Sequence, residues 1–364
     1  MKLLYITNGI NGSGGLERVL SIKASYLAEH YGYEVSILCL NNNHLNPFYI
    51  FSKKIQMYSI PVGGSIFENI FEYKRGIKSI VRDVQPDVIS VCDDGLKGFF
   101  VPLIIREKIP IIYERHASIN LNFNKENKGI FFFLQAKLQY NLMKNLATNF
   151  EKFIVLTKSN LKEWKGDNLS VIPNALSFYP KESAALDTKK IIVVGSHSYN
   201  KGYDLLFLTW KKVAEVYKDW TLNIYGMPDI NNTFKKKAEK MGLIGSVNFY
   251  DPVKNIKSKY LNSSIMVLPS RSEGFGMVII EAMACGIPCV SFNCPHGPAD
   301  IIHDGIDGYL VKNGNIESLA EKLITLIENQ TLRKEMGARG RENVQRYLPE
   351  NIVKEWDELF HKLI

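Results

Sequence analysis

The sequence predicts an α/β protein made of two Rossmann-like lobes in series. Short unbroken runs of β-branched residues and leucine alternate with amphipathic segments along the whole chain. This alternation restarts after about residue 178, and 364 residues exceed the size at which a single core usually stops growing. Such alternation is typical of parallel sheets covered by helices on both faces, with ligands at the carboxyl ends of the strands.

The expected strands are short apolar runs, the pattern typical of strands buried on both faces. The first half of the chain contains five of them, at residues 3–7, 34–40, 88–92, 109–113 and 153–156. The second half contains five more, at residues 191–194, 222–225, 247–250, 265–268 and 289–292.

Amphipathic helices are expected between these strands, for example at residues 16–31, 203–217 and 316–329. Residues 177–189 lack a strand pattern and contain Pro180, so we interpret them as a linker. The predicted domains are therefore residues 1–177 and 178–350, followed by a C-terminal helix at 351–364.

The segment at residues 130–146 is a further helix candidate with two interpretations. Its apolar side chains recur at three- and four-residue spacing, at Phe131, Leu134, Leu138, Leu142 and Leu146. Such a helix either packs in the core of the first lobe or borders a lipid or acceptor groove.

The most informative stretch runs from residue 268 to residue 292. A buried strand ends at Leu268, a glycine-bearing loop follows, and a helix is expected to begin near Gly276. A helix start at the end of a strand points its N–H groups outward and attracts anions. Glu273 and Glu281, eight residues apart, could hold hydroxyl groups at opposite ends of an elongated polar ligand.

This stretch resembles the signature of retaining GT-B glycosyltransferases of family 4. The resemblance rests on Ser-Glu-Gly-Phe-Gly at 272–276 and Glu-Ala-Met-Ala-Cys-Gly-Ile-Pro at 281–288. It extends to residues 298–311, 195–206 and 12–18, and so covers essentially the whole chain. It implies the GT-B fold, with an acceptor lobe and a donor lobe around an interlobe cleft. It also implies that the C-terminal helix packs back on the first lobe, the alternative being a surface helix of the second.

The resemblance implies a role for each matching residue of the second lobe. Glu273 would contact the donor sugar and Glu281 the ribose hydroxyls, while the strand and loop at 247–253 would flank the base. Lys201 would pair with the diphosphate and stabilise its departing charge. Main-chain groups would complete the donor site, those of Gly274, Phe275 and Gly276 at the sugar and those of Met277 and Val278 at the diphosphate.

The chain departs from the family at one position. Family members commonly carry arginine directly after the glycine that corresponds to Gly195, where this sequence has Ser196 followed by His197. Ser196 is kept among the expected nucleotide-sugar ligands, and His197 or Arg271 could replace the missing guanidinium.

The first lobe is expected to contribute a glycine loop and a histidine. By resemblance, Gly14 and Gly15 would face the phosphates of the donor. His116 follows a strand at its carboxyl end, where the family often has a histidine near the donor sugar. It completes the expected catalytic set of Glu273, Lys201 and His116. Strand alternation points Glu114 and Arg115 to opposite faces, so at most one of them should reach the cleft.

No metal or other cofactor is expected. The sequence contains no Asp-x-Asp motif, and Asp93-Asp94 fits the cap of a helix or turn better than a cation site. Cys285, Cys289 and Cys294 with His296 could form a zinc site, but the cysteines fit packed side chains better.

The resemblance implies transfer of a hexose or N-acetylhexosamine from a UDP-sugar, with retention of configuration. The acceptor would be a glycan or a lipid-linked glycan in the synthesis of a bacterial surface polysaccharide, such as lipopolysaccharide or capsule. Two alternatives remain, a nucleotide-sugar 2-epimerase of the same fold and a non-catalytic nucleotide-sugar-binding subunit. Acceptor specificity is expected in first-lobe loops, such as residues 40–52 and 117–129.

Charge narrows the choice of partners. The chain carries 45 basic and 37 acidic side chains, a net charge of +8, of which residues 1–180 contribute +6. This excess indicates an anionic acceptor, such as a lipid pyrophosphate at an anionic membrane, rather than nucleic acid, for which no recognition motif is present. With no signal peptide and no apolar run of 18 residues, the expected location is the cytoplasm, either free or in peripheral contact with the inner face of the membrane.

Overall fold

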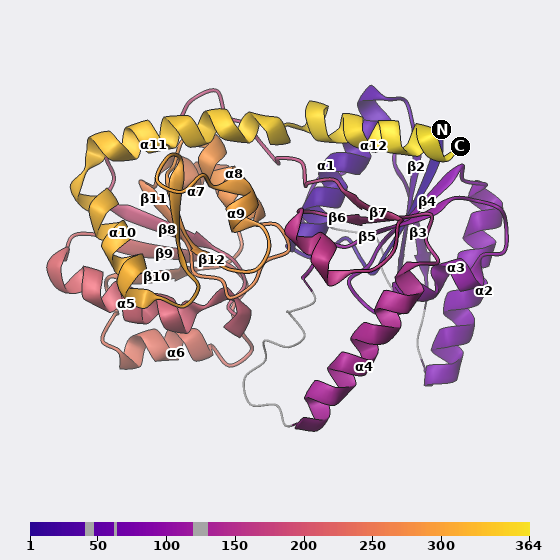
Figure 1. The fold of residues 1–364 in the computed structure, drawn as a ribbon, viewed down its shortest axis with the longest axis horizontal. Coiled ribbons are helices and arrows are strands. Elements are labelled where there is room, and N and C mark those ends of the chain that lie inside the picture. Colours follow the sequence, from indigo (N-terminus) through magenta and orange to yellow (C-terminus); the bar gives the residue numbers. More distant parts are fainter. Residues whose placement is uncertain (41–46, 62–63, 119–129) are drawn as a thin grey trace. The chain divides into compact units, whose positions relative to one another are not determined.

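The structure is a computed structural model that describes residues 1–40, 47–61, 64–118 and 130–364 (Figure 1). The described residues up to Ser177, with the C-terminal Pro349–Ile364, form one compact unit, and Phe178–Leu348 forms another. Each unit contains one parallel sheet, which confirms the predicted α/β class with two Rossmann-like lobes. Residues 41–46 and 119–129 of the expected specificity loops lie outside the described residues.

The first unit has a seven-stranded sheet with the order β3-β2-β1-β4-β5-β6-β7. The five strands predicted in this half correspond to β1, β2, β4, β5 and β6. The bounds are β1 Lys2–Thr7, β2 Glu34–Leu40, β3 Gln56–Ile60, β4 Val88–Cys92, β5 Ile111–Glu114, β6 Lys152–Val155 and β7 Leu169–Val171.

The second unit has a six-stranded sheet with the order β10-β9-β8-β11-β12-β13. The five strands predicted in this half correspond to β8 through β12. The bounds are β8 Lys190–Val194, β9 Thr221–Tyr225, β10 Val247–Tyr250, β11 Ile265–Leu268, β12 Cys289–Asn293 and β13 Gly308–Lys312.

The three strands that the sequence did not predict all lie at sheet edges. They are β3, β7 and β13. An edge strand pairs on one side only and is partly solvated, so it needs no unbroken apolar run. All three residues of β7 are only partly buried, and β3 has a single buried residue, Ile60.

Helices of the first unit flank its sheet. Helix α2 begins with a capping box, in which the Ser65 hydroxyl accepts from the Glu68 N–H and the Glu68 carboxylate accepts from the Ser65 N–H. The bounds are α1 Gly15–His30, α2 Ile66–Val84, η1 Lys97–Phe100, α3 Val101–Ile104, α4 Ile130–Ala147, η3 Ser159–Glu163 and α12 Pro349–Leu363.

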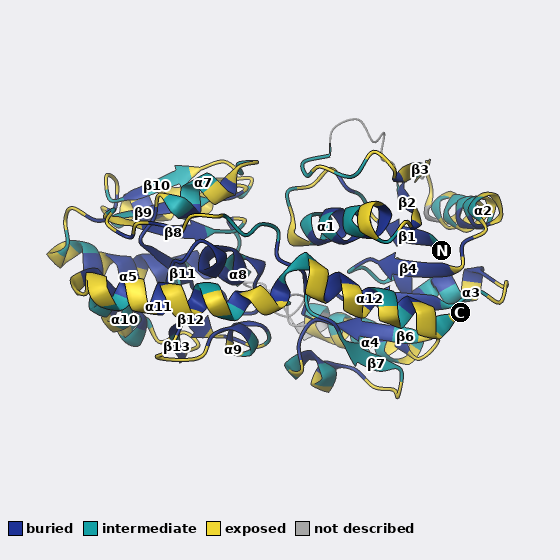
Figure 2. Ribbon diagram, turned by 90° about the horizontal axis from the view of Figure 1, so that it is seen from above, coloured by how far each residue is buried: buried dark blue, intermediate teal, exposed yellow. Residues whose placement is uncertain are grey.

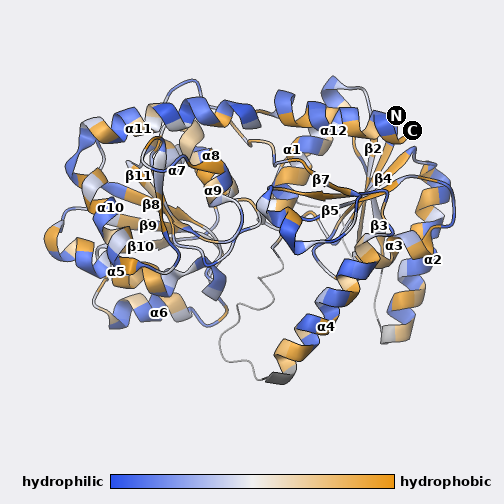
Figure 3. Ribbon diagram, viewed as in Figure 1, coloured by the Kyte–Doolittle hydropathy of each residue, from blue (hydrophilic) through white to orange (hydrophobic). Residues whose placement is uncertain are grey.

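Helix α4 is not packed in the core along its whole length, in contrast to one of its two predicted interpretations. Its buried residues are Met143 and Ala147, near its C-terminal end. Leu134, Leu138 and Leu142 are 53%, 70% and 42% exposed, so most of the stripe expected to face the core faces solvent, and only Leu146 among its described side chains packs against the core. The buried positions lie in the last two turns, and the ribbon of the preceding turns, which carries several apolar residues, runs away from the sheet (Figure 3). The side chain of Phe131 lies outside the described part of the chain.

The C-terminal helix α12 belongs to the first unit, where it packs on α1. Val353, Trp356 and Phe360 are buried along one side of α12. The Tyr33 hydroxyl, just after α1, donates to the Asp357 carboxylate at 2.7 Å. One apolar face and one polar contact therefore fix this helix to the first unit.

Helices of the second unit surround a core of aliphatic and aromatic side chains from α5, α10 and the sheet. Helix α8 is buried almost all around, in contrast to the half-exposed α10 and α11 (Figure 2). The bounds are η4 Tyr199–Lys201, α5 Tyr203–Val216, α6 Thr233–Lys240, α7 Ile256–Leu261, α8 Met277–Ala284, α9 Pro298–Ile301, α10 Ile316–Glu328, α11 Gln330–Asn343 and η5 Val344–Tyr347. Among the described residues of both units, no helix has the length and hydropathy needed to cross a membrane.

The packing of α12 generates a first prediction, for Phe360→Ala. Phe360 is fully buried, so its truncation should leave a cavity and lower the free energy of unfolding by about 3–5 kcal/mol. Urea unfolding measures this loss. Lys354→Ala, at an exposed position of the same helix, should change the free energy by less than about 0.5 kcal/mol. Equal effects of the two substitutions would contradict the packing described for α12.

Candidate functional site

The loop between β11 and α8 follows a buried strand and contains a glycine with a positive φ. All four residues of β11 are buried, and the chain then turns at Gly276, which has a φ of 101°. Only glycine adopts this conformation without strain, so the residue fixes where α8 begins. Met277 and Val278 follow in the first turn of α8, where N–H groups lack carbonyl partners one turn earlier in the helix, whereas the Ile279 N–H donates to the Gly276 carbonyl at 2.9 Å. The loop therefore presents main-chain donors at the carboxyl end of β11, where a diphosphate was expected.

Lys201 and Glu273 contact each other in this region. The Lys201 ammonium lies 2.6 Å from a Glu273 carboxylate oxygen, and the two side chains are 24% and 10% exposed. The Lys201 stem passes over Gly195, where an added Cβ would lie 3.4 Å from its Cδ. The structure thus brings together two of the three side chains expected to be catalytic. Their opposite charges neutralise each other at the ends of β8 and β11.

Arg271 has a different environment from the one expected. Its guanidinium donates to both carboxylate oxygens of Asp204, at 2.8 and 2.7 Å, and to the Tyr199 carbonyl at 2.6 Å. It also stacks over the Tyr199 ring, 3.8 Å from the centroid. Burial alone would raise the pKa of Asp204, but the Arg271 guanidinium holds it below its usual value. Arg271 therefore ties the donor loop to η4 and α5, and its charge is already matched.

Main-chain contacts reinforce the same connection. The Arg271 N–H donates to the Asn200 carbonyl at 2.8 Å, and the Asn200 amide donates to the Ser272 carbonyl at 2.8 Å. At Gly202 φ is +67°, and an added Cβ would overlap the Pro269 carbonyl oxygen. These contacts hold the segment that carries Lys201 against the loop that carries Glu273.

His197 does not replace the missing arginine in the structure. It is buried between the rings of Tyr203 and Phe249, at centroid distances of 5.3 and 5.4 Å. Burial lowers its pKa, which favours a neutral imidazole. Neither ring nitrogen has a hydrogen-bond partner among the described residues. Ser196, by contrast, is exposed at the end of β8.

Glu281 lies inside α8 and is fully buried. The Tyr260 hydroxyl of α7 lies 3.4 Å from one of its carboxylate oxygens and 3.4 Å from the Val278 carbonyl. The structure therefore places Glu281 one turn beyond the start of α8, on the same helix as the main-chain donors of Met277 and Val278.

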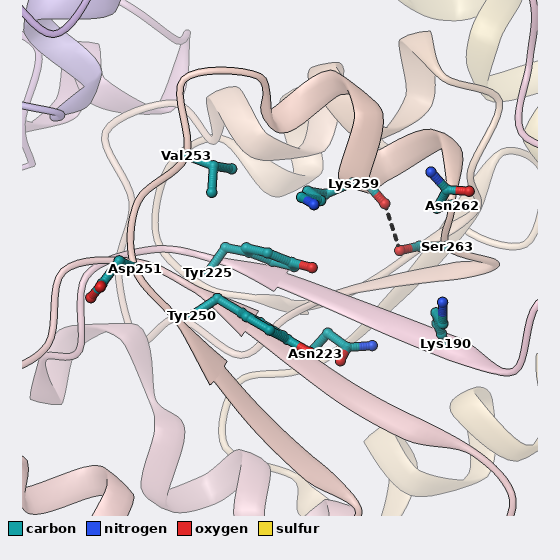
Figure 4. Close-up of a pocket in the computed structure, with 9 residues that line it drawn as sticks. All are labelled: Lys190, Asn223, Tyr225, Tyr250, Asp251, Val253, Lys259, Asn262 and Ser263. Carbon is teal, nitrogen blue, oxygen red and sulfur yellow. Dashed lines mark hydrogen bonds between the residues drawn. The ribbon is translucent and has the colours of Figure 1, made fainter.

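A cavity of about 450 Å³ opens on the edge of the second sheet, beside α7 (Figure 4). Tyr225 and Tyr250 stack in it with ring centroids 4.7 Å apart and 14° between planes. Asp251 and Val253, which line it, follow the strand expected to flank the base. The remaining lining residues are Asn223 in the middle of β9 and four residues at α7 and the amino ends of β8 and β11: Lys190, Lys259, Asn262 and Ser263.

His116 lies in the first unit, just after β5. Its main-chain N–H and that of Ala117 donate to the Asp94 carboxylate at 3.3 and 3.1 Å. Its ring Nε2 lies 3.2 Å from the buried Glu114 carboxylate. Arg115 turns away from this contact and donates to the Asp94 carbonyl at 2.6 Å. Glu114 and Arg115 thus have separate partners, as strand alternation implies.

The glycine loop before α1 lies against an acidic side chain. Gly14 is the N-cap of α1 and Gly15 its first residue. An added Cβ on Gly14 would lie 2.6 Å from the Glu17 carboxylate, so the glycine makes room for this group. Burial raises the pKa of Glu17. A phosphate at Gly14 and Gly15 would meet this carboxylate.

Three potential metal ligands, Cys92, Glu114 and His116, lie within 4.8 Å of one another. The Lys23 ammonium already pairs with Glu114, so its positive charge occupies the place that a metal ion would take beside this carboxylate. Asp93 accepts from the Gly95 N–H at 2.6 Å, the turn cap expected for Asp93-Asp94. Cys285, Cys289 and Cys294 are buried, and burial raises the pKa of Cys285 to about 12, which favours packed thiols over metal ligands.

The sequence did not predict the contacts of three further residues. Lys23 pairs with Glu114, Asp204 pairs with Arg271, and the Trp356 ring lies beside the Lys23 ammonium. Lys23 had a visible signal, because it lies within the apolar stripe of α1 between Val19, Leu20 and Leu27. A lysine in such a stripe indicates a buried partner. Asp204 had no comparable signal, since an acidic residue in the first turn of a helix is common.

The connection through Arg271 generates a second prediction. Arg271→Ala and Asp204→Asn should each lower the free energy of unfolding of the second unit by about 1–3 kcal/mol, because each leaves a half-buried charged or polar group without its partner. The double variant should lose little more than either single variant. Urea unfolding measures all three.

A matched control is Lys212→Ala, which breaks an exposed pair with Glu317 and should cost less than about 1 kcal/mol. Strictly additive losses for the Arg271 and Asp204 variants would contradict the pairing. Binding of UDP provides a second readout. If Arg271 held a diphosphate instead, Asp204→Asn would leave UDP affinity unchanged while Arg271→Ala would reduce it.

The chain is similar to known glycosyltransferases over its whole length. The family model described as glycosyl transferases group 1 matches residues 178–343. A Haemophilus influenzae protein named "Uncharacterized glycosyltransferase" is 31% identical over 98% of both chains. The amylovoran biosynthesis glycosyltransferase AmsD of Erwinia amylovora is 28% identical over 99% of both chains.

The fold is also similar to that of solved structures of other proteins. The structure of Anabaena Alr3699/HepE in complex with UDP-glucose superposes with a TM-score of 0.78, at 16% identity over all of both chains. Together with the parallel sheets of its two units and the signature around Glu273 and Glu281, these similarities identify the chain as a GT-B glycosyltransferase of the group 1 family.

Proposed function

We propose that this glycosyltransferase moves a hexose or N-acetylhexosamine from a UDP-sugar to a glycan or lipid-linked glycan, with retention and without a metal ion. The contact between Lys201 and Glu273 beside the start of α8 carries the proposal. It places a cation, a carboxylate and main-chain N–H groups at adjacent strand ends, the set of groups that a sugar diphosphate requires. The relative AmsD supports a role in bacterial surface polysaccharide synthesis, and the UDP-glucose complex of HepE supports a UDP-sugar.

In the proposed reaction, the bond between the anomeric carbon and the diphosphate oxygen breaks as the acceptor oxygen bonds to the same face of that carbon. The acceptor proton passes to the departing diphosphate. Lys201 and the N–H groups of Met277 and Val278 stabilise the negative charge that develops there. Glu273 holds the sugar hydroxyls and Glu281 the ribose. Gly14, Gly15 and His116 contribute from the first unit.

Because serine replaces the family arginine, stabilisation of the departing diphosphate depends more strongly on Lys201. Arg271 is bound to Asp204, and burial favours a neutral His197, so we assign neither to the diphosphate. Ser196 is exposed and can donate one hydrogen bond but no charge. Lys201 is then the principal cation at the leaving group.

We also propose peripheral contact with an anionic membrane, on the cytoplasmic face. Two helices of the first unit expose large apolar side chains: Phe67, Ile70 and Phe71 on α2, and Phe133, Leu134 and Leu138 on α4. Basic residues on the same helices, among them Lys74, Lys78 and Lys137, match the positive charge of residues 1–180. Apolar side chains beside lysines suit an interface with anionic lipid headgroups.

A third prediction concerns Glu273 and Lys201. Glu273→Ala should abolish transfer and Lys201→Ala should lower the rate by about 10²–10³-fold, because each removes a group that acts on the transition state. Consumption of donor is measured with a panel of UDP- and GDP-sugars. Glu317→Ala and Lys189→Ala, at exposed ion pairs of the same unit, are the matched controls and should retain full activity.

The same assay distinguishes the alternatives. EDTA should leave the rate unchanged, and strict metal dependence or a GDP-sugar preference would contradict the corresponding part of the proposal. A 2-epimerase would convert a UDP-sugar to an isomer without an acceptor. A binding subunit would retain the UDP-sugar without turnover, and a fully active Glu273→Ala variant would overturn the site assignment.

A fourth prediction concerns the membrane. The protein should sediment with vesicles that contain phosphatidylglycerol more than with neutral phosphatidylcholine vesicles, and Phe67→Ser with Phe71→Ser should reduce this binding several-fold. Ile230→Ser, at an exposed apolar position of the second unit, is the control. Equal binding to both vesicle types would remove the support for an anionic surface.

A further inference from the structure

We propose that Glu114 is a positioning residue that holds His116 as its Nε2–H tautomer and leaves Nδ1 to accept a hydrogen bond from a sugar hydroxyl. This inference deepens the proposed function and rests on its assignment of His116 to the substrate. Four elements of the first unit contribute to the arrangement: β4 with Ser90, β5 with Glu114, α1 with Lys23 and α12 with Trp356.

Both carboxylate oxygens of Glu114 are occupied in the interior. The Ser90 hydroxyl donates to Oε1 at 2.5 Å, and the Lys23 ammonium and the His116 ring both contact Oε2. Glu114 is 1% exposed, and burial alone would raise its pKa, but Lys23 and the hydrogen bond from His116 lower it to about 2. An ionised carboxylate only accepts hydrogen bonds, so the His116 Nε2 must carry the proton that they share.

Lys23 is the buried counter-ion of this carboxylate. The ammonium lies 3.8 Å from the centroid of the Trp356 ring and 5.1 Å from that of Tyr5, and the side chain is 2% exposed. Aromatic faces stabilise a cation that has lost its water. The C-terminal helix therefore takes part in the site of the first unit through Trp356, which covers the cation that pairs with Glu114.

The opposite ring nitrogen has no such partner. His116 Nδ1 is buried and makes no hydrogen bond to any described residue. The backbone at His116 is held by the bond of its N–H to Asp94, and the ring is held by the contact of Nε2 with Glu114. A buried acceptor without a donor is costly, and a hydroxyl of the sugar can supply that donor. Glu114 thus determines which nitrogen of His116 meets the substrate.

The tautomer can be measured directly, without substrate, by long-range ¹H–¹⁵N correlation of ¹⁵N-histidine-labelled protein, with the His116 signals assigned by their loss in His116→Gln. At a pH where the ring is neutral, the wild type should show a protonated Nε2 and an unprotonated Nδ1. A protonated Nδ1, or a mixture of both forms, would overturn the inference.

The double variant Lys23→Met with Glu114→Gln tests the cause. Removing both charges avoids a buried lysine without a counter-ion, so the variant should fold, which urea unfolding checks. A glutamine amide both donates and accepts, so the His116 signals should move toward a mixture of tautomers. A pure Nε2–H form in the folded double variant would show that Glu114 is not the group that fixes it.

Turnover of the UDP- or GDP-sugar accepted in the donor panel gives the second readout. The double variant should lose on the order of tenfold or more in kcat with a donor KM within about twofold of wild type. Tyr33→Phe is the matched control, because it loosens α12 at Asp357 without touching Glu114, and should keep both tautomer and rate.

The outcomes separate this inference from the proposed function. An Nε2–H tautomer with full activity of His116→Gln would overturn the contact between Nδ1 and the substrate, and with it the role of His116 in the proposed function. An inactive His116→Gln with a mixed tautomer in the wild type would overturn the inference about Glu114 alone.

Discussion

A buried charge is costly unless it has a partner, and this constraint decides which groups stay available at the strand ends of both units. In the first unit, Glu114 is matched by Lys23, so the neighbouring histidine does not need to be charged to balance it. In the second unit, Arg271 is matched by Asp204, and Lys201 by Glu273. The first two pairs are structural. In the third, Lys201 has the most exposed of the six side chains, at 24%, and under the proposed function a ligand replaces its partner.

The central strands could be predicted from sequence because they are buried on both faces and need unbroken apolar runs. β4 and β11 have no exposed residue, and their runs were readable without any tertiary information. β3, β7 and β13 lie at the edges, where partial solvation removes that requirement. The interpretation of α4 as a core-packed helix was wrong for a related reason. Periodicity shows that a helix has an apolar side, but not whether that side meets the core or solvent, and Leu138 meets solvent.

The candidate site was predictable where its chemistry is local in sequence. Glu273, Gly276 and Glu281 lie within one strand–loop–helix unit, so their spacing already fixes their relation to the end of β11. Pairings between distant segments were not predictable. Asp204 and Arg271 are 67 residues apart, and Lys23 and Glu114 are 91 apart. Each pair depends on which strands become neighbours in the sheet, a property of the whole unit rather than of either residue.

The position of Ser196 shows how such pairings limit substitution. An arginine after Gly195 would place a second cation at the end of β8, close to Lys201, whose stem already passes over that glycine. With serine there, Lys201 has Glu273 as its neighbour and no competing cation at position 196, so one carboxylate can balance it while no donor is bound. Under the proposed function, the diphosphate of the donor pairs with Lys201 in place of Glu273, which frees the carboxylate for the hydroxyls of the sugar. The diphosphate thus becomes the partner of Lys201 and the sugar becomes the partner of Glu273, so neither charge is left without a partner when the donor binds.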